Sequence, residues 1–238
     1  SLCDWSSDVC SSDLLDGRMF LSGLAAALFH DAGYLKDKGD AEGTGGKLAF
    51  IHVSRSRTLA RHYLEDKKWP QEEVDLIDEI IQVTEFAKPV SLTGRLTRFP
   101  GRVIASIVGT ADLMAQMADI RYMERLPELF AEFKEAYEHE GIEKLKASGV
   151  HVFGSAQEMV DGTIMFFEQF VVPRFESLGR MDRFLEVFFG ESRNPYMETI
   201  STNLYRTALT VKERPSKRIG EMLQDTGKVS SEAIERAL

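Results

Sequence analysis

The amino-acid sequence predicts an all-α helical bundle followed by a short C-terminal helical appendage. Apolar residues recur at intervals of three and four along nearly the whole chain, as they do on the buried face of an amphipathic helix. The alternation of apolar and polar residues that marks a half-buried strand is essentially absent. Glycine- and proline-containing stretches break the helical pattern into separate segments.

The helical segments follow one another in chain order at residues 21–29, 48–64, 70–86, 102–118, 126–141, 155–179 and 194–211. The first is too apolar for a surface helix, so we expect it at the centre of the bundle. The second carries its apolar residues on one stripe and polar residues on the outer face. Together the segments predict one helical domain over residues 15–211.

Local signals support two of the helix starts. Pro70 stands where the third segment begins, and acidic residues follow in its first turn, as helix N-termini favour. Ser155 and Glu158 form a capping box at the start of the sixth segment. Between the helices, residues 39–47 predict a flexible glycine-rich loop and residues 94–102 a basic loop.

Residues 1–14 differ from the rest of the chain and contain both of its cysteines, Cys3 and Cys10. They hold no Lys, Arg or apolar run, which excludes a secretory signal. Two cysteines without a nearby histidine cannot complete a tetrahedral zinc shell. Written as codons, residues 3–14 resemble a common sequencing-library adapter. We interpret residues 1–14 as an adapter-derived artefact, with a disordered natural tail as the alternative, and expect the natural N-terminus to be missing.

The composition excludes several classes of partner. Without Asp4, Asp8 and Asp13, 29 basic residues face 35 acidic ones, which leaves a net charge of −6. Such a surface gives no electrostatic reason to expect a nucleic acid polymer or an anionic membrane as partner. No apolar run approaches the roughly 18–20 residues that span a bilayer. We therefore expect a cytoplasmic protein with no membrane span, and leave a homodimer open.

The chemistry-bearing residues stand at His30-Asp31, at the end of the apolar first segment, and at Asp112 in the fourth. A histidine beside a carboxylate suits a divalent metal such as iron, manganese, magnesium or zinc. Alone, the dipeptide is also explained by helix capping and a satisfied core histidine. Asp112 lies among apolar residues, where a carboxylate is costly to bury unless it is paired, hydrogen-bonded or bound to metal. Asp119 lies two turns further on, at the helix end, where solvation explains it better.

Three motifs occur in order: AALFHDAGYL, GTGGKLAFIHVSRS, and GTADLMAQMAD followed by YMERLPELFAEF. In these the chain resembles the HD superfamily of metal-dependent phosphohydrolases over about residues 20–190. The resemblance implies an HD-domain-like helical bundle with one or two divalent metal ions. It also implies that His30, Asp31 and Asp112 are metal ligands. Asp31 would in addition act as the catalytic base that takes a proton from the attacking water.

The chain departs from the superfamily pattern at the upstream histidine ligand, which belongs to a helix before the His-Asp helix. No natural histidine precedes His30. We attribute this to truncation rather than evolutionary loss, so the first helix is expected to be missing. The metal shell of this fragment would then be one ligand short, which leaves the activity of the fragment itself open.

Further residues around the glycine-rich loop are candidates for a second metal or a phosphate contact. His52 follows the loop where many relatives carry another histidine, and Lys47 with the amides of residues 43–46 could hold an anion. Arg55 could reach the same anion. A helix-surface histidine, a mobile connection and a solvated helix face are the structural alternatives. Thr84 falls where some relatives have a metal-binding histidine, which argues against a fully ligated two-metal site.

Residues 212–238 are predicted to form a linker and an incomplete helical module. They resemble the opening of the N-terminal domain of type II secretion ATPases, relatives of which bind cyclic dinucleotides. An ordinary helical hairpin explains the same pattern. The chain stops inside a predicted helix, so we expect the C-terminus to be truncated as well.

The leading function is metal-dependent hydrolysis of a phosphoester, on a nucleotide or related small phosphorylated molecule. The alternative is a non-catalytic HD-like module that senses a nucleotide and signals to the C-terminal appendage. Retention of all three expected ligands favours the enzyme. The sequence chooses neither the substrate nor the metal, because His and Asp ligands accept several ions.

Overall fold

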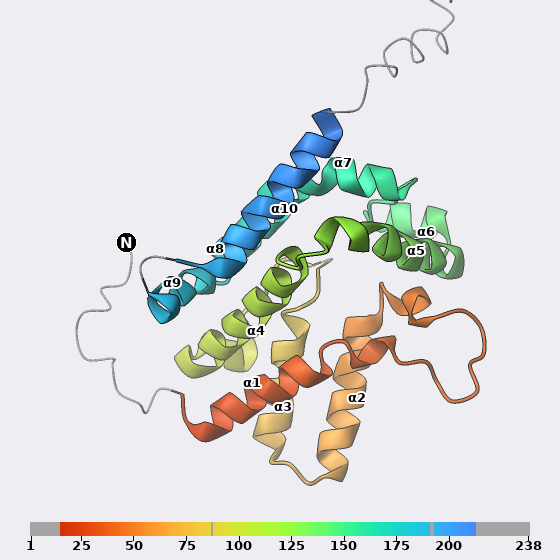
Figure 1. Ribbon diagram of the computed structural model, residues 1–238. Coiled ribbons are helices and arrows are strands. Elements are labelled where there is room, and N and C mark those ends of the chain that lie inside the picture. The colour runs from red at the N-terminus through yellow and green to blue at the C-terminus, as the bar shows by residue number, and fades with distance from the viewer. Residues whose placement is uncertain (1–14, 87, 191–192, 213–238) are drawn as a thin grey trace, which may run out of the picture.

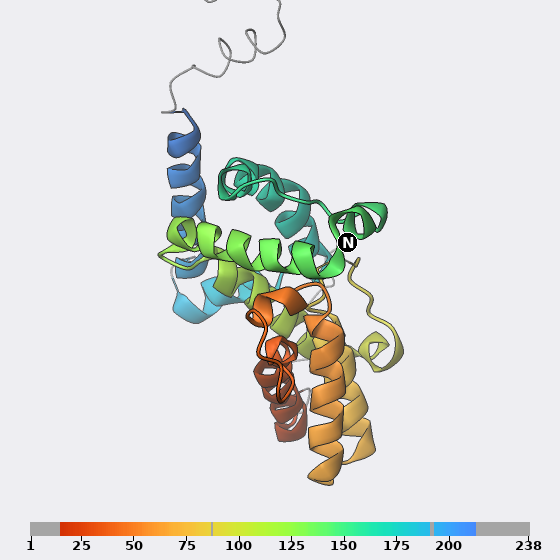
Figure 2. The same ribbon diagram turned by 90° about the vertical axis from the view of Figure 1, so that its right-hand side faces the viewer.

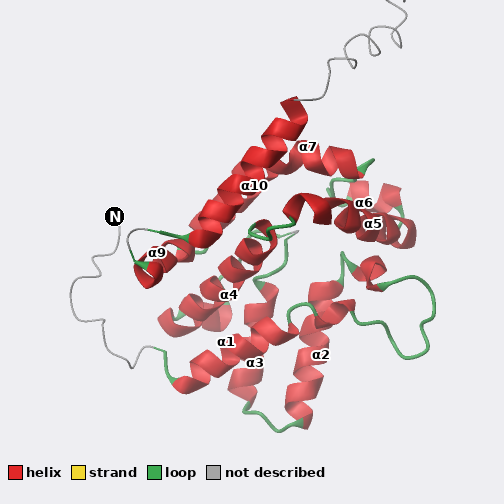
Figure 3. Ribbon diagram, in the orientation of Figure 1, coloured by secondary structure: helices red, strands yellow, loops and turns green. Residues whose placement is uncertain are grey.

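The computed structural model describes residues 15–212, apart from residues 87 and 191–192 (Figure 1). Within this part of the chain every regular element is a helix and none is a strand, which confirms the predicted all-α bundle (Figure 3). The segment attributed to an adapter and nearly all of the predicted C-terminal module, residues 213–238, lie outside the described residues.

The α-helices occur in the predicted order, with short additional helices between them. They are α1 Gly17–Phe29, α2 His52–Asp66, α3 Gln71–Gln82, α4 Phe99–Met117, α5 Tyr122–Glu140, α6 Ile142–Ala147, α7 Ala156–Phe166, α8 Val172–Ser177, α9 Phe184–Phe189 and α10 Pro195–Lys212. Tighter 3₁₀ turns lie at Ala32–Tyr34, Gly45–Leu48, Gly94–Thr97 and Met181–Arg183, and a π-helical turn at Phe167–Val171.

Helix α4 runs through the middle of the bundle and belongs to two hydrophobic clusters. Its first half, including Ile104 and Val108, packs with α1, α2 and α3. Its second half, including Leu113 and Met117, packs with α5, α7, α8 and α10. The two groups of helices lie on opposite sides of α4 (Figures 1 and 2). Asp112 therefore stands where the two halves of the molecule meet.

Helix α1 is less buried than its composition predicts, which corrects the expectation of a central helix. It turns small residues inward, among them Ala25 and Ala26, and Gly23 approaches Ile104 so closely that a Cβ would lie 2.8 Å from its Cγ2. Several of its larger side chains remain exposed: Phe20 is 64% exposed and Leu24 48%. The close approach to α4 requires small residues on the facing side of α1, so Phe20 and Leu24 are left outside this contact.

The predicted helix over residues 155–179 is interrupted. Ser155 caps it as expected, since its hydroxyl accepts a hydrogen bond from the Glu158 amide at 3.1 Å. Glu158 closes the cap on the Gly154 amide rather than on that of Ser155. The π-helical turn Phe167–Val171 then precedes Pro173, which has no amide proton and cannot continue the regular ladder.

No single helix of the described part is long and apolar enough to cross a membrane. Helices α4 and α5 meet the criteria of length and composition only as a pair bent by 106°.

Candidate functional site

The end of α1 presents His30 and Asp31 through a turn that is fixed to α2. His30 caps α1, and its main-chain carbonyl accepts a hydrogen bond from the Ser56 hydroxyl at 2.5 Å. The same hydroxyl accepts a hydrogen bond from the Gly33 amide at 2.8 Å. Ser56 is fully buried, so this link between the turn and α2 is shielded from water. It fixes the direction in which the two side chains leave the turn.

Gly33 is required by the approach of α2. A Cβ at this position would lie 1.9 Å from the main-chain oxygen of His52 and 2.8 Å from the Ser56 nitrogen, both backbone atoms that cannot turn aside. We expect Gly33→Ala to lower the free energy of unfolding by about 2–3 kcal/mol, because the turn and α2 must separate. Chemical denaturation measures the change.

Gly17→Ala is the matched control for this substitution. A Cβ at Gly17 meets no atom within 4 Å, and the residue begins α1. Alanine there should leave stability unchanged or raise it by about 0.5–1 kcal/mol. Equal effects at the two glycines would contradict the packing argument.

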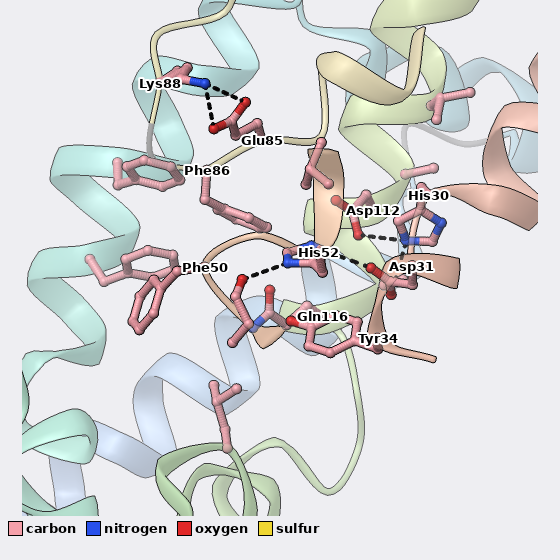
Figure 4. A pocket seen from close by; sticks show the side chains of 18 of the residues that line it. His30, Asp31, Tyr34, Phe50, His52, Glu85, Phe86, Lys88, Asp112 and Gln116 are labelled. Carbon is pink, nitrogen blue, oxygen red and sulfur yellow. Dashed lines mark hydrogen bonds and ion pairs between the residues drawn. The ribbon is translucent and has the colours of Figure 1, made fainter. Parts of the chain in front are cut away.

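Four side chains from three parts of the fold converge at this turn (Figure 4). We call the set the His–Asp cluster; its members are His30, Asp31, His52 and Asp112. The Nε2 atom of His30 lies 3.2 Å from Asp31 Oδ2 and 3.4 Å from Asp112 Oδ1. The Nε2 atom of His52 lies 3.6 Å from Asp31 Oδ1. The structure thus brings together the three predicted metal ligands and the candidate His52.

Both imidazoles of the cluster are oriented by the main chain. His30 donates from Nδ1 to the Ala27 carbonyl at 2.8 Å, and His52 donates from Nδ1 to the Ala49 carbonyl at 2.6 Å. With Nδ1 carrying a proton, the Nε2 lone pair of the neutral ring is left for a proton or a metal ion. Metal-binding histidines are commonly held in this way by a backbone carbonyl.

The donor chemistry of the cluster fits a divalent metal ion. Imidazole nitrogens and carboxylate oxygens are ligands that iron, manganese and zinc accept. Two donors that share one ion at about 2.0–2.2 Å lie roughly 3.0–3.5 Å apart, close to the separations in the cluster. As they stand, however, no three His, Cys, Asp or Glu side chains of the described residues are jointly placed to hold an ion. Instead the Nε2 atom of His30 contacts both carboxylates.

The carboxylates set the protonation of the cluster. The hydrogen bond to Asp112, and after it that to Asp31, raises the pKa of His30 from 6.5 to about 10 against the opposing effect of burial. Burial acts to raise the pKa of Asp31, but the hydrogen bond and charge of His30 and the charge of His52 outweigh it, so that this pKa lies below its usual value. Without metal, His30 is therefore protonated and Asp31 ionised at neutral pH.

The two predicted phosphate contacts, Lys47 and Arg55, are engaged within loops instead. The Lys47 ammonium lies 2.7 Å from an Asp40 carboxylate oxygen and donates to the Glu42 carbonyl at 2.8 Å. Arg55 donates to the main-chain carbonyls of Gly33 and Leu35 and pairs with Asp37. Neither residue lines the cavity beside the cluster. Arg55 holds the turn that follows α1, and Lys47 holds the glycine-rich loop after it.

The glycine-rich loop likewise has an internal anion. Glu135 of α5 accepts hydrogen bonds from the Thr44 amide and the Thr44 hydroxyl, both at 2.5 Å. The Gly46 amide donates to the Thr44 hydroxyl at 3.0 Å. A carboxylate of the same chain therefore occupies amides that were expected to hold a phosphate. Thr84, at the position noted for a further histidine, is buried and donates to the Ile81 carbonyl.

A large cavity opens from the His–Asp cluster, with a volume of about 1370 Å³. It is bordered by α1 and α4 near the cluster and by residues of α5 and α7 further away. His30, Asp31, His52 and Asp112 all line it. In Figure 4 the His–Asp cluster and Tyr34 lie on one side of the view, and the labelled phenylalanines, Phe50 and Phe86, lie on the other together with the ion pair of Glu85 and Lys88.

Sequence reasoning missed two polar residues beside the cluster, Tyr34 and Gln116. Tyr34 stacks on the His52 ring with centroids 4.3 Å apart, and burial, followed by the charges of Asp31, Glu132 and Asp112, raises the pKa of its phenol. It remains a neutral hydrogen-bonding group at physiological pH. Gln116 lies one helical turn after Asp112 and also lines the cavity. That four-residue spacing was the available signal, since it places both side chains on one face.

Comparison with known proteins gives one family. A family model described as Npun_R2479-like matches residues 9–173, well over half of the chain. The matched part contains all four residues of the His–Asp cluster. No curated protein and no solved structure matches the chain significantly.

Proposed function

The chain belongs to the Npun_R2479-like family, and from its His–Asp cluster we propose that it is a metal-dependent phosphoester hydrolase. One observation carries the proposal. Two imidazoles fixed through Nδ1 to backbone carbonyls direct Nε2 toward two carboxylates on the wall of a large cavity. The resemblance to the HD superfamily supports the same proposal, because the residues of the cluster lie in the three motifs that carry the resemblance.

The residues that would hold the ion are His30, Asp31 and Asp112, with His52 beside them. When bound, a divalent ion lowers the pKa of water toward about 7 and stabilises negative charge on a phosphoryl group. Asp31 has the most open carboxylate of the cluster, with 58% of its side chain exposed, and it is ionised. It is placed to accept a proton from water in the cavity, as a general base must. The Tyr34 phenol would orient a substrate oxygen.

A non-catalytic sensing module is the second candidate, and one observation favours it. The Nε2 atom of His30 already lies within 3.4 Å of both carboxylates, so the cluster is electrostatically satisfied without an ion. In that case the cavity would bind a ligand without converting it. The two candidates differ in metal binding and in turnover.

Hydrolysis of general phosphoesters tests the proposal. Separate samples of the chain would be loaded with Mn²⁺, Fe²⁺, Mg²⁺ or Zn²⁺. Each would be assayed with 4-nitrophenyl phosphate and bis(4-nitrophenyl) phosphate. We expect turnover that stops on chelation and is lost in Asp31→Ala. Asp37→Ala is the matched control, because Asp37 is 81% exposed and pairs only with Arg55 among the contacts described above. Stoichiometric metal binding without turnover would favour the sensor.

Metal binding should depend on pH because the ion competes with the proton on His30. We expect the apparent affinity for Mn²⁺ to rise about tenfold per pH unit from about pH 6 to about pH 8, since the pKa of His30 is about 10. Titration calorimetry in two buffers of different ionisation enthalpy should detect about one released proton per ion at neutral pH. Affinity independent of pH would contradict ligation by His30.

The proton on His30 also stabilises the metal-free fold, and this contribution to the free energy of unfolding decreases as the pH rises. The pKa of His30 is higher in the folded chain than its ordinary 6.5, so this contribution is complete below pH 6.5 and is lost as the pH rises through about 10.

A cytoplasmic location belongs to the proposal as well, because the expected substrates are small phosphorylated molecules of metabolism.

A further inference from the structure

The cavity next to the His–Asp cluster has an aromatic far wall. Two groups of rings make it up. The Phe170 ring stacks on both Phe86 and Phe166, with centroid distances of 5.7 Å and 5.1 Å respectively. Phe133 lies 5.8 Å from Phe50 and 6.4 Å from Phe153. All six rings line the cavity and all are only partly buried.

Half-buried phenylalanines that face one cavity favour an apolar occupant. A ring left open to water on one side loses the stabilisation that covering its surface would give. The same part of the lining includes the apolar side chains of Leu129 and Met159, beside the polar residues Ser148, His151 and Thr163. At about 1370 Å³ the cavity exceeds the roughly 300–1,000 Å³ typical of small-molecule pockets, so there is room for a long chain.

The charges of the lining disfavour a polyphosphate. Among the described residues that line the cavity, the only Lys or Arg is Lys88, and its ammonium lies 2.8 Å from Glu85. Arg174 lies behind the aromatic wall, over Phe86 and Phe170, but its guanidinium donates to the carbonyls of residues 83, 85 and 88. A nucleoside triphosphate would find no cation free to bind its phosphates.

We propose that this cavity binds the apolar chain of an alkyl, acyl or prenyl phosphoester, with the phosphate at the His–Asp cluster. The proposal rests on the proposed function, since it names the substrate class of that site. The His–Asp cluster lies at one end of the lining, and the phenylalanines lie at the other, where the charges of Glu85 and Lys88 pair with each other (Figure 4). The lining therefore matches a molecule with one phosphorylated end and one apolar end. Each methylene that leaves water should improve affinity by up to about fourfold.

Binding to the metal-loaded chain tests chain-length dependence without requiring turnover. The probes are butyl phosphate, decyl phosphate below its micellar concentration, and adenosine monophosphate, measured by titration calorimetry with Mn²⁺ present and absent. We expect decyl phosphate to bind at least about 100-fold more tightly than butyl phosphate, since six additional methylenes enter the cavity. Adenosine monophosphate should bind no better than butyl phosphate.

Two variants separate cavity filling from loss of fold. At Gly162 of α7 an added Cβ meets only Phe153, at 4.0 Å, so Gly162→Leu fits and fills the cavity. It should weaken decyl phosphate at least tenfold and leave butyl phosphate unchanged. Phe86→Ser should act in the same direction by removing part of the wall. Phe188→Ser is the control, because Phe188 is 79% exposed on α9 and does not line the cavity.

The outcomes distinguish this inference from the proposed function. Tight, chain-length-dependent binding that Gly162→Leu reduces supports the inference, whether or not any phosphoester is hydrolysed. Absence of hydrolysis with every metal, together with such binding, would overturn only the proposed function. Hydrolysis that is equal for butyl and decyl esters, preferred binding of adenosine monophosphate, or no binding of decyl phosphate would overturn the inference.

Discussion

Replacing Asp112 by asparagine is expected to lower turnover by about a thousandfold or more and metal affinity by about a hundredfold or more. Asp112 is the only cluster residue from α4, and its carboxylate lies 3.4 Å from His30 Nε2 with 20% of the side chain exposed. Asparagine keeps the size of the side chain but removes the charge. The cluster would lose one of the two anions that compensate a divalent ion.

The titration of His30 in the metal-free variant gives a second readout. The hydrogen bond to Asp112 is the largest contribution to the raised pKa of His30, so Asp112→Asn should bring this pKa down toward 6.5. NMR titration of the imidazole measures it. A merely structural role for Asp112 would change stability without this shift.

Asp119→Asn is the matched control for Asp112→Asn. Asp119 follows the same helix, but its carboxylate accepts a hydrogen bond from the Arg121 amide and lies 3.7 Å from Arg125. It does not line the cavity. Turnover, metal affinity and the pKa of His30 should remain unchanged. If Asp112→Asn retained full activity and metal, the proposed assignment of the cluster would be wrong.

Replacing Arg174 by methionine is expected to lower the free energy of unfolding by about 3–5 kcal/mol. Arg174 is 7% exposed, and its guanidinium donates to the carbonyls of Val83, Glu85 and Lys88 at 2.6–3.1 Å. Burial lowers the pKa of this side chain, yet no carboxylate forms an ion pair with it among the described residues. Methionine would fill most of the volume but leave these main-chain oxygens without donors.

Chemical denaturation measures this loss, and Arg125→Met serves as its control. Arg125 is 48% exposed and pairs with Glu128 and Asp119 on the surface, so its removal should cost less than about 1 kcal/mol. Arg174→Lys should recover part of the stability, because an ammonium can donate to some of the same carbonyls. Wild-type stability in Arg174→Met would show that the segment 83–88 does not depend on this donor.

The helices were predictable because their signals are local. The apolar period, the cap at Ser155 and the proline at the start of α3 each act within about one helical turn, and the structure confirms them. The interruption at Phe167–Val171 had a local signal too, in Pro173. The exposure of α1 had no local signal in the sequence, because it depends on the close packing of Gly23 against Ile104 of α4.

The site was predictable only in part. An isolated carboxylate on an apolar helix, Asp112, indicated a buried partner, and the His30-Asp31 pair at a helix end indicated a polar site. Neither pattern predicts that the Ser56 hydroxyl holds the turn. Neither predicts that the two imidazoles donate hydrogen bonds to the carbonyls of Ala27 and Ala49. The two residues expected to contact phosphate do not line the cavity, because the local pattern does not specify their tertiary partners either. Lys47 pairs with Asp40, and Arg55 donates a hydrogen bond to the Gly33 carbonyl in the turn after α1.

By itself, the sequence determined the helical class and the order of the helices, and it indicated His30, Asp31 and Asp112 as candidate metal ligands. Only the tertiary structure decided which of those groups meet, which cations are already neutralised, and that phenylalanines from separate helices surround one cavity. Helix formation is governed by neighbours three and four residues away, whereas the partner of a charge or a ring is set by packing between helices distant in the chain.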